Sequence, residues 1–285
     1  MILRHATGLL AIDRCQVMGI VNRTPDSFFD GGRLDLGASV DFALELEQQG
    51  ADLLDLGGVR AGPGPAVPVE EEIGRLLPLV EALAGRSSVP LSVETARPTV
   101  ARAAFDAGAS ILNDVTALAD ADLVSTCASA GGALVLMHHG GQIRGRPRTP
   151  RYEDVVSSVL AEWDRLSALA RGSGVAPDGV LLDPGLDFGK NTYHSLELMR
   201  RLNELVGFGG PVLVAPSRKD VVGETLGLPP DERLPGTLAL VALAVNAGAA
   251  IVRVHDVKAA RDVVTMVEAV RGRVAPRSPV RGLWD

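Results

Sequence analysis

Eight short apolar runs, each of the length of a β-strand, alternate along this chain with amphipathic segments of helical length. The expected strands are Gln16–Val21, Asp52–Leu56, Leu91–Val93, Ser110–Asn113, Ala133–Met137, Val180–Leu182, Val212–Ala215 and Ile251–Val254. The expected helices are Ala38–Gln49, Val69–Leu83, Pro98–Ala107, Ala121–Ala130, Tyr152–Ala170, Ser195–Leu205, Leu234–Asn246 and Val257–Val270. Strands that are apolar throughout are typical of parallel sheets buried on both faces. Eight consecutive strand–helix units predict an α/β fold, a single closed (β/α)8 barrel of the TIM type.

The length of the chain fits one such barrel. Barrels of this type commonly take about 250 residues, and this chain has 285, of which 46% are hydrophobic and available for one large core. We therefore expect a single domain over residues 1–285. Residues 1–15 are expected to form a small hairpin that closes the barrel floor, and residues 275–285 an irregular tail.

Charge and composition exclude several classes of protein. A net charge of -7 and a pI near 5.3 argue against a nucleic-acid partner, because no basic face is evident that would release counterions. Cys15 and Cys127 lack the spacing of a metal site, so a reduced, cytoplasmic setting is expected. The longest apolar tract, residues 237–252, is interrupted by Asn246 and Gly248, and fits a buried helix and strand better than a membrane span. We expect no membrane attachment.

Polar side chains stand at or just past the carboxyl ends of the predicted strands. They are Asn22, Glu94, Asn113, His138, Asp183, Lys219, Arg253 and His255. In a (β/α)8 barrel such positions converge on one site at the C-terminal face. Taken singly, each has an ordinary alternative: Asn113 and Asp183 could cap the following helices, and Glu94 could serve as a structural ion-pair partner. Their occurrence together at the ends of separate strands favours a shared site.

The loop after the first strand carries Asn22, Thr24, Pro25, Asp26 and Asp30. These residue types are common in ordinary turns. They also place two carboxylates at the C-terminal end of a strand, where this architecture carries its chemistry. From the residues alone, both interpretations stay open.

Read together, these segments resemble the dihydropteroate synthase family. The matching segments are residues 17–32, Val93-Glu94-Thr95, Leu112-Asn113-Asp114-Val115, Leu136-Met137-His138, Leu182-Asp183-Pro184-Gly185, Phe188-Gly189-Lys190, Ser217-Arg218-Lys219 and Val252-Arg253-Val254-His255-Asp256. They extend over nearly the whole chain and are highly specific in sum. The resemblance implies a (β/α)8 barrel of the pterin-binding type.

The resemblance also implies a substrate, 6-hydroxymethyl-7,8-dihydropterin pyrophosphate, which p-aminobenzoate attacks, and a homodimeric assembly. The residues implied in pterin binding are Glu94, Asn113, Met137, Asp183, Lys219 and Arg253. Those implied in pyrophosphate binding are Asn22, Arg253 and His255, with Mg²⁺ as cofactor held through Asn22. The implied catalytic residues are Asp26, Asp30 and Lys219, which would stabilise charge that develops on the pterin and its leaving group.

The chain departs from the family where the amine acceptor is expected. Family members usually carry Glu-Ser-Thr-Arg-Pro-Gly after the second strand, and the Ser/Thr-Arg pair that helps to build the aminobenzoate pocket is missing here. The altered acceptor residues are Val59, Arg60, Ala61, Gly62 and Asp220. Asp220 stands where the family often has Ser or Arg. It either repels the benzoate carboxylate or caps the helix that follows.

Three further replacements also depart from the family. Glu94 stands where the family has Asp, Arg23 where it has an apolar residue, and Asp187 where glycine is common. The pattern is similar to a divergent branch of the family found in actinobacteria. Our first hypothesis is a pterin-pyrophosphate-binding protein whose aminobenzoate transferase activity is weak or lost. The alternatives are a working dihydropteroate synthase of folate biosynthesis, a non-catalytic ligand-binding protein that acts through a partner, and, less favoured, a folate-binding methyltransferase.

Overall fold

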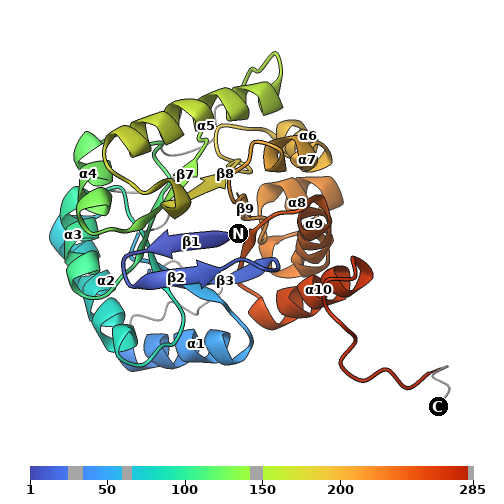
Figure 1. Cartoon of the computed structure of the whole chain (residues 1–285), viewed down its shortest axis with the longest axis horizontal. Helices are drawn as coiled ribbons and strands as arrows, with labels where there is room; N and C mark the ends of the chain where they lie inside the picture. The colour runs from blue at the N-terminus through green and yellow to red at the C-terminus, as the bar shows by residue number, and fades with distance from the viewer. Residues whose placement is uncertain (25–34, 60–65, 142–149, 282–285) are drawn as a thin grey trace.

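The computed structural model describes residues 1–24, 35–59, 66–141 and 150–281 (Figure 1). Its strands are β1 (Ile2–His5), β2 (Gly8–Ala11), β3 (Gln16–Asn22), β4 (Leu53–Gly57), β5 (Leu91–Glu94), β6 (Ile111–Asp114), β7 (Ala133–Met137), β8 (Val180–Asp183), β9 (Leu213–Val214) and β10 (Ile251–Val254). Its helices are α1 (Leu36–Gln48), α2 (Val69–Ala84), α3 (Pro98–Asp106), α4 (Ala121–Ser129), α5 (Val155–Gly172), α6 (Thr192–Arg200), α7 (Leu202–Val206), α8 (Asp220–Leu226), α9 (Leu234–Ala247) and α10 (Val257–Val270). Short 3₁₀ turns are η1 (Pro177–Gly179) and η2 (Pro230–Glu232).

Eight parallel strands form one sheet in the order β8-β7-β6-β5-β4-β3-β10-β9. An isolated parallel bridge between Leu182 and Val212 joins the two outer strands and brings the sheet close to closure. Figure 1 shows the helices as a ring around these strands. The predicted fold class, a (β/α)8 barrel, is confirmed.

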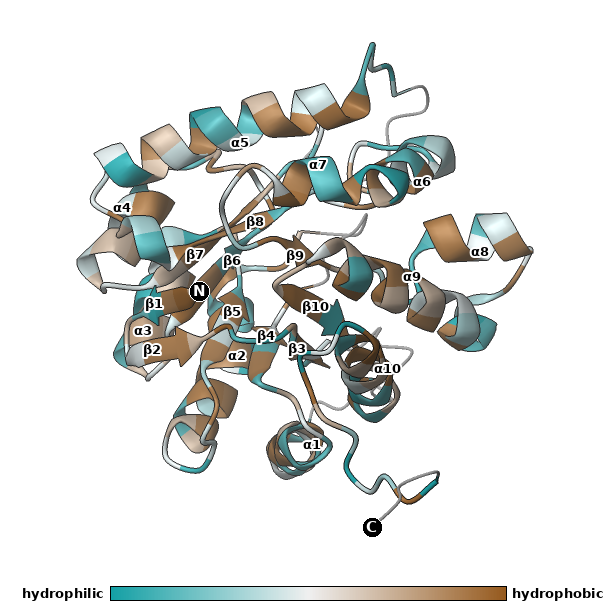
Figure 2. Cartoon of the chain, turned by 45° about the vertical axis from the view of Figure 1, so that its right-hand side comes forward, coloured by the Kyte–Doolittle hydropathy of each residue, from teal (hydrophilic) through white to brown (hydrophobic). Residues whose placement is uncertain are grey.

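The strands bury both of their faces in two separate apolar layers. Along β4, Leu53 packs inside the barrel with Met18 and Ile111, whereas the next residue, Leu54, packs outward against the helices. Successive strand residues point to opposite faces, so an all-apolar strand supplies both layers at once. Figure 2 shows the apolar strands at the centre and the hydrophilic residues on the outer surfaces of the helices.

The antiparallel hairpin of β1 and β2 lies across one end of the barrel (Figure 1). Leu3 is fully buried there and joins the inner apolar layer together with Ile12. The amide of Ala6 donates to the carbonyl of Ser110, 3.2 Å away, directly before β6. This end is therefore filled by apolar side chains, and the polar residues gather at the opposite end.

The segment predicted as one helix, Ser195–Leu205, is two helices. The backbone of Arg201 (φ -106°, ψ 22°) separates α6 from α7. Its guanidinium contacts Glu197 at 3.1 Å, Glu204 at 2.7 Å and Asp154 at 2.8 Å. The break between α6 and α7 thus lies at a residue with three ion pairs. The hydrophobic pattern of the sequence did not indicate this break.

Other element boundaries moved by a few residues. Helix α5 begins at Val155 rather than Tyr152, because the carboxylate of Asp154 caps it by accepting from the amide of Ser157 at 2.7 Å. Strand β9 keeps only two of its four predicted residues, and α8 is a short helix that the predicted set did not delimit. Within the described part of the chain, no helix is both long enough and apolar enough to span a membrane.

Candidate active site at the carboxyl ends of the strands

The predicted site residues lie where the parallel strands end. Asn22, Glu94, Met137 and Asp183 are the last residues of their strands, and Asn113 is one residue from the end of β6. The basic residues come from β10, from the segment that follows it and from the segment before α8; they are Arg253, His255 and Lys219. One end of the barrel therefore collects the side chains that were predicted to bind pterin and pyrophosphate.

Asp55, which was not among the predicted site residues, lies at the centre of this group. Its side chain is fully buried in β4 and accepts hydrogen bonds from Ser92 Oγ at 2.5 Å and Asn113 Nδ2 at 2.9 Å. Its Oδ2 also lies 2.6 Å from Arg253 Nε. A carboxylate inside an otherwise apolar strand was the available sign, since buried charges are paired or functional.

Glu94 completes the surroundings of Arg253. Its Oε2 lies 2.8 Å from Arg253 Nη2, so the guanidinium bridges the carboxylates of Glu94 and Asp55. With Asp183 and Lys219 also nearby, the cluster holds three carboxylates and two cations, one negative charge in excess. Burial raises the pKa of Glu94 to about 7 despite the attraction of Arg253, so Glu94 takes up a proton near neutral pH.

Glu94→Gln tests this proton uptake. In the unfolded chain Glu94 titrates near 4.5, and in the folded chain near 7. Between these values the folded chain binds more protons, so wild-type stability falls as pH rises. The free energy of unfolding of Glu94→Gln, relative to wild type, should therefore rise by about 3 kcal/mol from pH 4.5 to 7, at roughly 1.36 kcal/mol per pKa unit. Chemical denaturation at both pH values measures it; a constant difference contradicts the assignment.

Asp183 is held in place by the turn that follows it. Its Oδ1 accepts from the amide of Gly185 at 2.7 Å, and its own carbonyl accepts from Trp163 Nε1 at 3.2 Å. The side chain is 5% exposed, and burial raises its pKa while Lys219 lowers it. Asp183 does not cap α6, whose N-cap is Asn191. The carboxylate is thus a fixed, buried acceptor at the barrel mouth.

Lys219 precedes α8 and reaches back toward the β8–α6 turn. Its Nζ donates to the carbonyl of Leu186 at 2.8 Å and lies 5.0 Å from the ring centroid of Phe188. Burial lowers the pKa of Lys219, and Asp183 opposes that shift. Lys190 supports the same turn, since its Nζ, in a side chain 1% exposed, donates to three backbone carbonyl groups at 2.9 to 3.0 Å.

His255 and Asn22 lie at the same end of the barrel. His255 Nδ1 is 2.9 Å from Ser217 Oγ, and burial lowers the pKa of His255 to about 4. The ring is therefore neutral at pH 7. Asn22 ends β3, and its Oδ1 approaches Gly57 so closely that a Cβ there would lie 2.9 Å from it. The absence of a side chain at Gly57 leaves room for the amide of Asn22.

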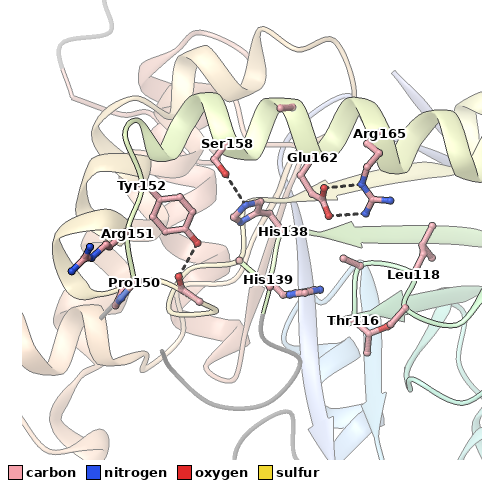
Figure 3. A pocket seen from close by; sticks show the side chains of 16 residues that line it. Thr116, Leu118, His138, His139, Pro150, Arg151, Tyr152, Ser158, Glu162 and Arg165 are labelled. Atoms are coloured by element: carbon pink, nitrogen blue, oxygen red, sulfur yellow. Dashed lines mark hydrogen bonds and ion pairs between the residues drawn. The ribbon is translucent and has the colours of Figure 1, made fainter. Parts of the chain in front are cut away.

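His138 does not join the group, contrary to the prediction. Its ring faces α5, with Nε2 3.3 Å from Ser158 Oγ, and burial lowers its pKa to about 3 (Figure 3). It lines a separate hollow of about 1090 Å³, together with Tyr152 and the Glu162–Arg165 ion pair. The strand ends at Met137, so the next side chain turns outward to the helix layer.

Asp220 does not have one of its two predicted roles, that of N-cap to α8. Its carboxylate lies 2.7 Å from Arg233 Nη1, which compensates its charge. It is the first residue of α8 rather than the N-cap, a position held by Lys219 without a side-chain hydrogen bond. The amide of Asp220 donates to the carboxylate of Asp187 instead.

Part of the predicted site lies outside the described residues. This applies to the two first-loop aspartates and to most of the second loop, namely Asp26, Asp30, Arg60, Ala61 and Gly62. Val59, the first altered residue of the second loop, is described and half-buried just after β4. Of the altered acceptor residues, the structure therefore describes Val59 and Asp220.

This geometry defines a class: a (β/α)8 barrel with a carboxylate, an amide, a lysine and an arginine at the mouth. The family described as pterin binding enzyme matches residues 18–255. The chain belongs to the dihydropteroate synthase family, as its sequence motifs indicated. "Inactive dihydropteroate synthase 2" of Mycobacterium tuberculosis (strain ATCC 25618 / H37Rv) is 46% identical over 281 residues, which cover 96% of this chain and 88% of that protein.

Proteins named as synthases are also similar. The dihydropteroate synthase of Escherichia coli (strain K12) is 41% identical over 262 residues, covering 91% of this chain and 93% of that protein. The Yersinia pestis dihydropteroate synthase, solved with a sulfonamide drug complex, superposes with a TM-score of 0.91 at 39% identity, covering 95% of this chain and 99% of that one. The Xanthomonas albilineans enzyme in complex with 7,8-dihydropteroate superposes with a TM-score of 0.84 at 42% identity. The match covers 94% of this chain and 98% of that one.

Proposed function

We propose that this chain binds 6-hydroxymethyl-7,8-dihydropterin pyrophosphate and transfers its pterin to p-aminobenzoate weakly or not at all. The observation that carries the proposal is the unequal state of the two half-sites. Asp183, Asn113 and Arg253 lie on or at the ends of rigid strands, whereas the sequence differs from the family in the second loop. The name of the mycobacterial relative, an inactive synthase, agrees with this division.

The strand residues suit a pterin in detail. Asp183 offers a buried carboxylate to the N–H donors of the aminopyrimidine edge. Asn113 donates its Nδ2 to Asp55, which leaves its amide oxygen to accept from a further pterin N–H group. Met137, 1% exposed beside Asp183, and the planar guanidinium of Arg253 offer surfaces to the ring.

The reaction of the family requires few covalent steps from the protein. The C–O bond between the pterin methylene and pyrophosphate breaks, and the electron pair leaves with pyrophosphate. The amine nitrogen then forms a C–N bond with the methylene cation and loses a proton. Arg253 and His255 would hold the leaving group, and Lys219 would donate to developing charge. We propose that Asp26 and Asp30 stabilise the cation.

We also propose Mg²⁺ as cofactor, held by Asn22. Among the described residues no cluster of three or more His, Cys, Asp or Glu side chains could hold a metal ion. One amide oxygen still fits Mg²⁺, which commonly keeps several waters and binds through one or two protein oxygens and the phosphates of the substrate. Gly57 leaves room for that amide. The ion would neutralise charge on the leaving pyrophosphate.

Release of pyrophosphate from dihydropterin pyrophosphate with Mg²⁺, with and without p-aminobenzoate, tests the proposal. We expect dihydropterin pyrophosphate to bind and p-aminobenzoate to accelerate release little or not at all. Lys219→Ala should lower any aminobenzoate-dependent release about 10- to 100-fold, since charged hydrogen bonds contribute about 1.5 to 3 kcal/mol. A wild-type rate equal to that of the Escherichia coli synthase, measured in parallel, would contradict the proposal.

A working synthase is the second candidate. It is favoured by Lys219 and Phe188, which keep close contact on the acceptor side, and by the likeness to the Escherichia coli enzyme. Growth of a synthase-deficient strain that expresses this chain would establish it. Tight pterin binding without turnover, together with a co-purifying protein, would instead favour the third candidate, a ligand-binding protein that acts through a partner.

The assembly and location remain parts of the proposal. We propose a cytoplasmic homodimer that uses the outer faces of α9 and α10, where Leu243, Met266 and Val270 are 54%, 64% and 74% exposed. Cys15 and Cys127 are both free and buried, which suits a reducing compartment. Sedimentation of the full chain measures the assembly.

A further inference from the structure

Asp187 has an unusual backbone conformation for a residue with a side chain. It lies between β8 and α6 with φ 68°, in the left-handed region that glycine, asparagine and aspartate tolerate best. Its Oδ2 accepts from the amides of Asp220 at 2.6 Å and Val221 at 3.3 Å, and its Oδ1 from Ser195 Oγ at 3.2 Å. These bonds fasten the turn to the segment that directly follows Lys219.

The Asp187 carboxylate therefore lies on the acceptor side of the candidate site. Phe188 follows Asp187 in the chain. Lys219 directly precedes the residues whose amides donate to Asp187. Lys219 Nζ and the Phe188 ring are 5.0 Å apart, and the charge of Asp187 acts to raise the pKa of Lys219. An anion attracted by Lys219 would meet this carboxylate.

The charge of Asp187 is compensated less directly than that of its neighbour Asp220. Asp220 pairs with Arg233 at 2.7 Å. The hydrogen bonds to Asp187 come from neutral donors, two amides and a hydroxyl group, and among the described residues it forms no ion pair. Lys219 directs its Nζ to the carbonyl of Leu186. The negative charge of Asp187 thus lies beside the start of α8. The amides of Asp220 and Val221 already donate to this carboxylate.

We propose that Asp187 is a specificity-determining residue that disfavours amines bearing a carboxylate, so that the preferred acceptor is an uncharged aromatic amine. This inference rests on the proposed function, because it concerns the second substrate of the same site. Two carboxylates a few ångströms apart at intermediate dielectric repel enough to lower affinity by a factor of ten or more. An uncharged ring would still pack against Phe188, whose side chain is half-buried.

The test compares two probes of the same shape, p-aminobenzoate and p-aminobenzamide. Each is titrated calorimetrically into the full chain loaded with 6-hydroxymethylpterin, pyrophosphate and Mg²⁺, a combination that cannot turn over. The variants are Asp187→Gly, which suits the positive φ, and Asp187→Asn, which removes the charge and keeps an acceptor oxygen. Asp178→Asn, in η1 near the hairpin at the other end of the barrel, controls for net charge.

We expect wild type and Asp178→Asn to bind the benzamide at least ten-fold more tightly than the benzoate. Both Asp187 variants should gain at least ten-fold in benzoate affinity and keep benzamide affinity within about two-fold. A ratio unchanged in both Asp187 variants, with 6-hydroxymethylpterin bound normally, overturns this inference alone. Failure of wild type to bind 6-hydroxymethylpterin overturns the proposed function, and this inference with it. If Asp187→Gly loses pterin binding through a shift of Lys219, the benzoate and benzamide affinities of Asp187→Asn decide whether the inference holds.

Discussion

Asp183→Ala is expected to weaken binding of 6-hydroxymethylpterin at least 100-fold. The carboxylate is 5% exposed and fixed by the amide of Gly185 at 2.7 Å, so no other described group replaces it as an acceptor at this strand end. Hydrogen bonds that involve a charged group contribute about 1.5 to 3 kcal/mol each, and the aminopyrimidine edge can donate two of them. Their sum of about 3 to 6 kcal/mol corresponds to two or more decades in the dissociation constant.

Quenching of pterin fluorescence on titration with protein measures this effect. Asp183→Asn is the matched variant, because it keeps an oxygen for the amide of Gly185 and lacks the charge. Its pterin affinity should lie between those of wild type and Asp183→Ala. Unfolding midpoints of all three proteins separate loss of binding from loss of fold. Pterin affinity that stays at the wild-type value in a folded Asp183→Ala protein would disprove the assignment of Asp183.

Arg253→Met is expected to lower the free energy of unfolding by about 3 to 5 kcal/mol. Arg253 bridges Asp55, which is fully buried, and Glu94, which is 9% exposed. Its removal leaves the carboxylates of Asp55 and Glu94 without their paired guanidinium in the barrel interior, and breaking one partner of a buried ion pair typically costs this amount. The thermal midpoint should fall by roughly 10 °C, at about 2 to 4 °C per kcal/mol.

Arg4→Met provides the matched control for this second experiment. Arg4 pairs with Asp178 at 3.1 Å on the surface, where the two side chains are 55% and 42% exposed. Surface pairs contribute about 0 to 1 kcal/mol, so this variant should unfold close to wild type. Equal losses of stability in the two variants would show that the Asp55–Arg253–Glu94 cluster is not a buried charge network.

The barrel was predictable because its strands are apolar on both faces. The alternation of such runs with amphipathic segments led to the eight strand–helix units, and the side chains at most strand ends converged as expected. Asp55 was not predicted because it precedes the end of its strand, and only the structure shows that its carboxylate pairs with Arg253. The prediction for His138 was wrong because the backbone has left the strand one residue beyond Met137. The side chain of His138 therefore faces α5.

Charge contacts between distant segments were the least predictable feature. Arg233 lies 13 residues from Asp220 in the chain, and Asp187 lies 33 residues from it, yet both contact Asp220. Sequence spacing carries no sign of such contacts, because the folding of two separate loops against each other creates them. The same limit applies to the break between α6 and α7 at Arg201.

The two proposed half-sites are built from different parts of the fold. The proposed pterin half uses side chains of the strands, such as Asn113 and Arg253, which also bond to Asp55 in the interior. The proposed acceptor half uses turns outside the strands. We therefore expect a substitution in the first half to lower the stability of the barrel more than one in the second. Under the proposed function, the partner amine is therefore the substrate that substitutions can change while the barrel and its charge cluster stay intact.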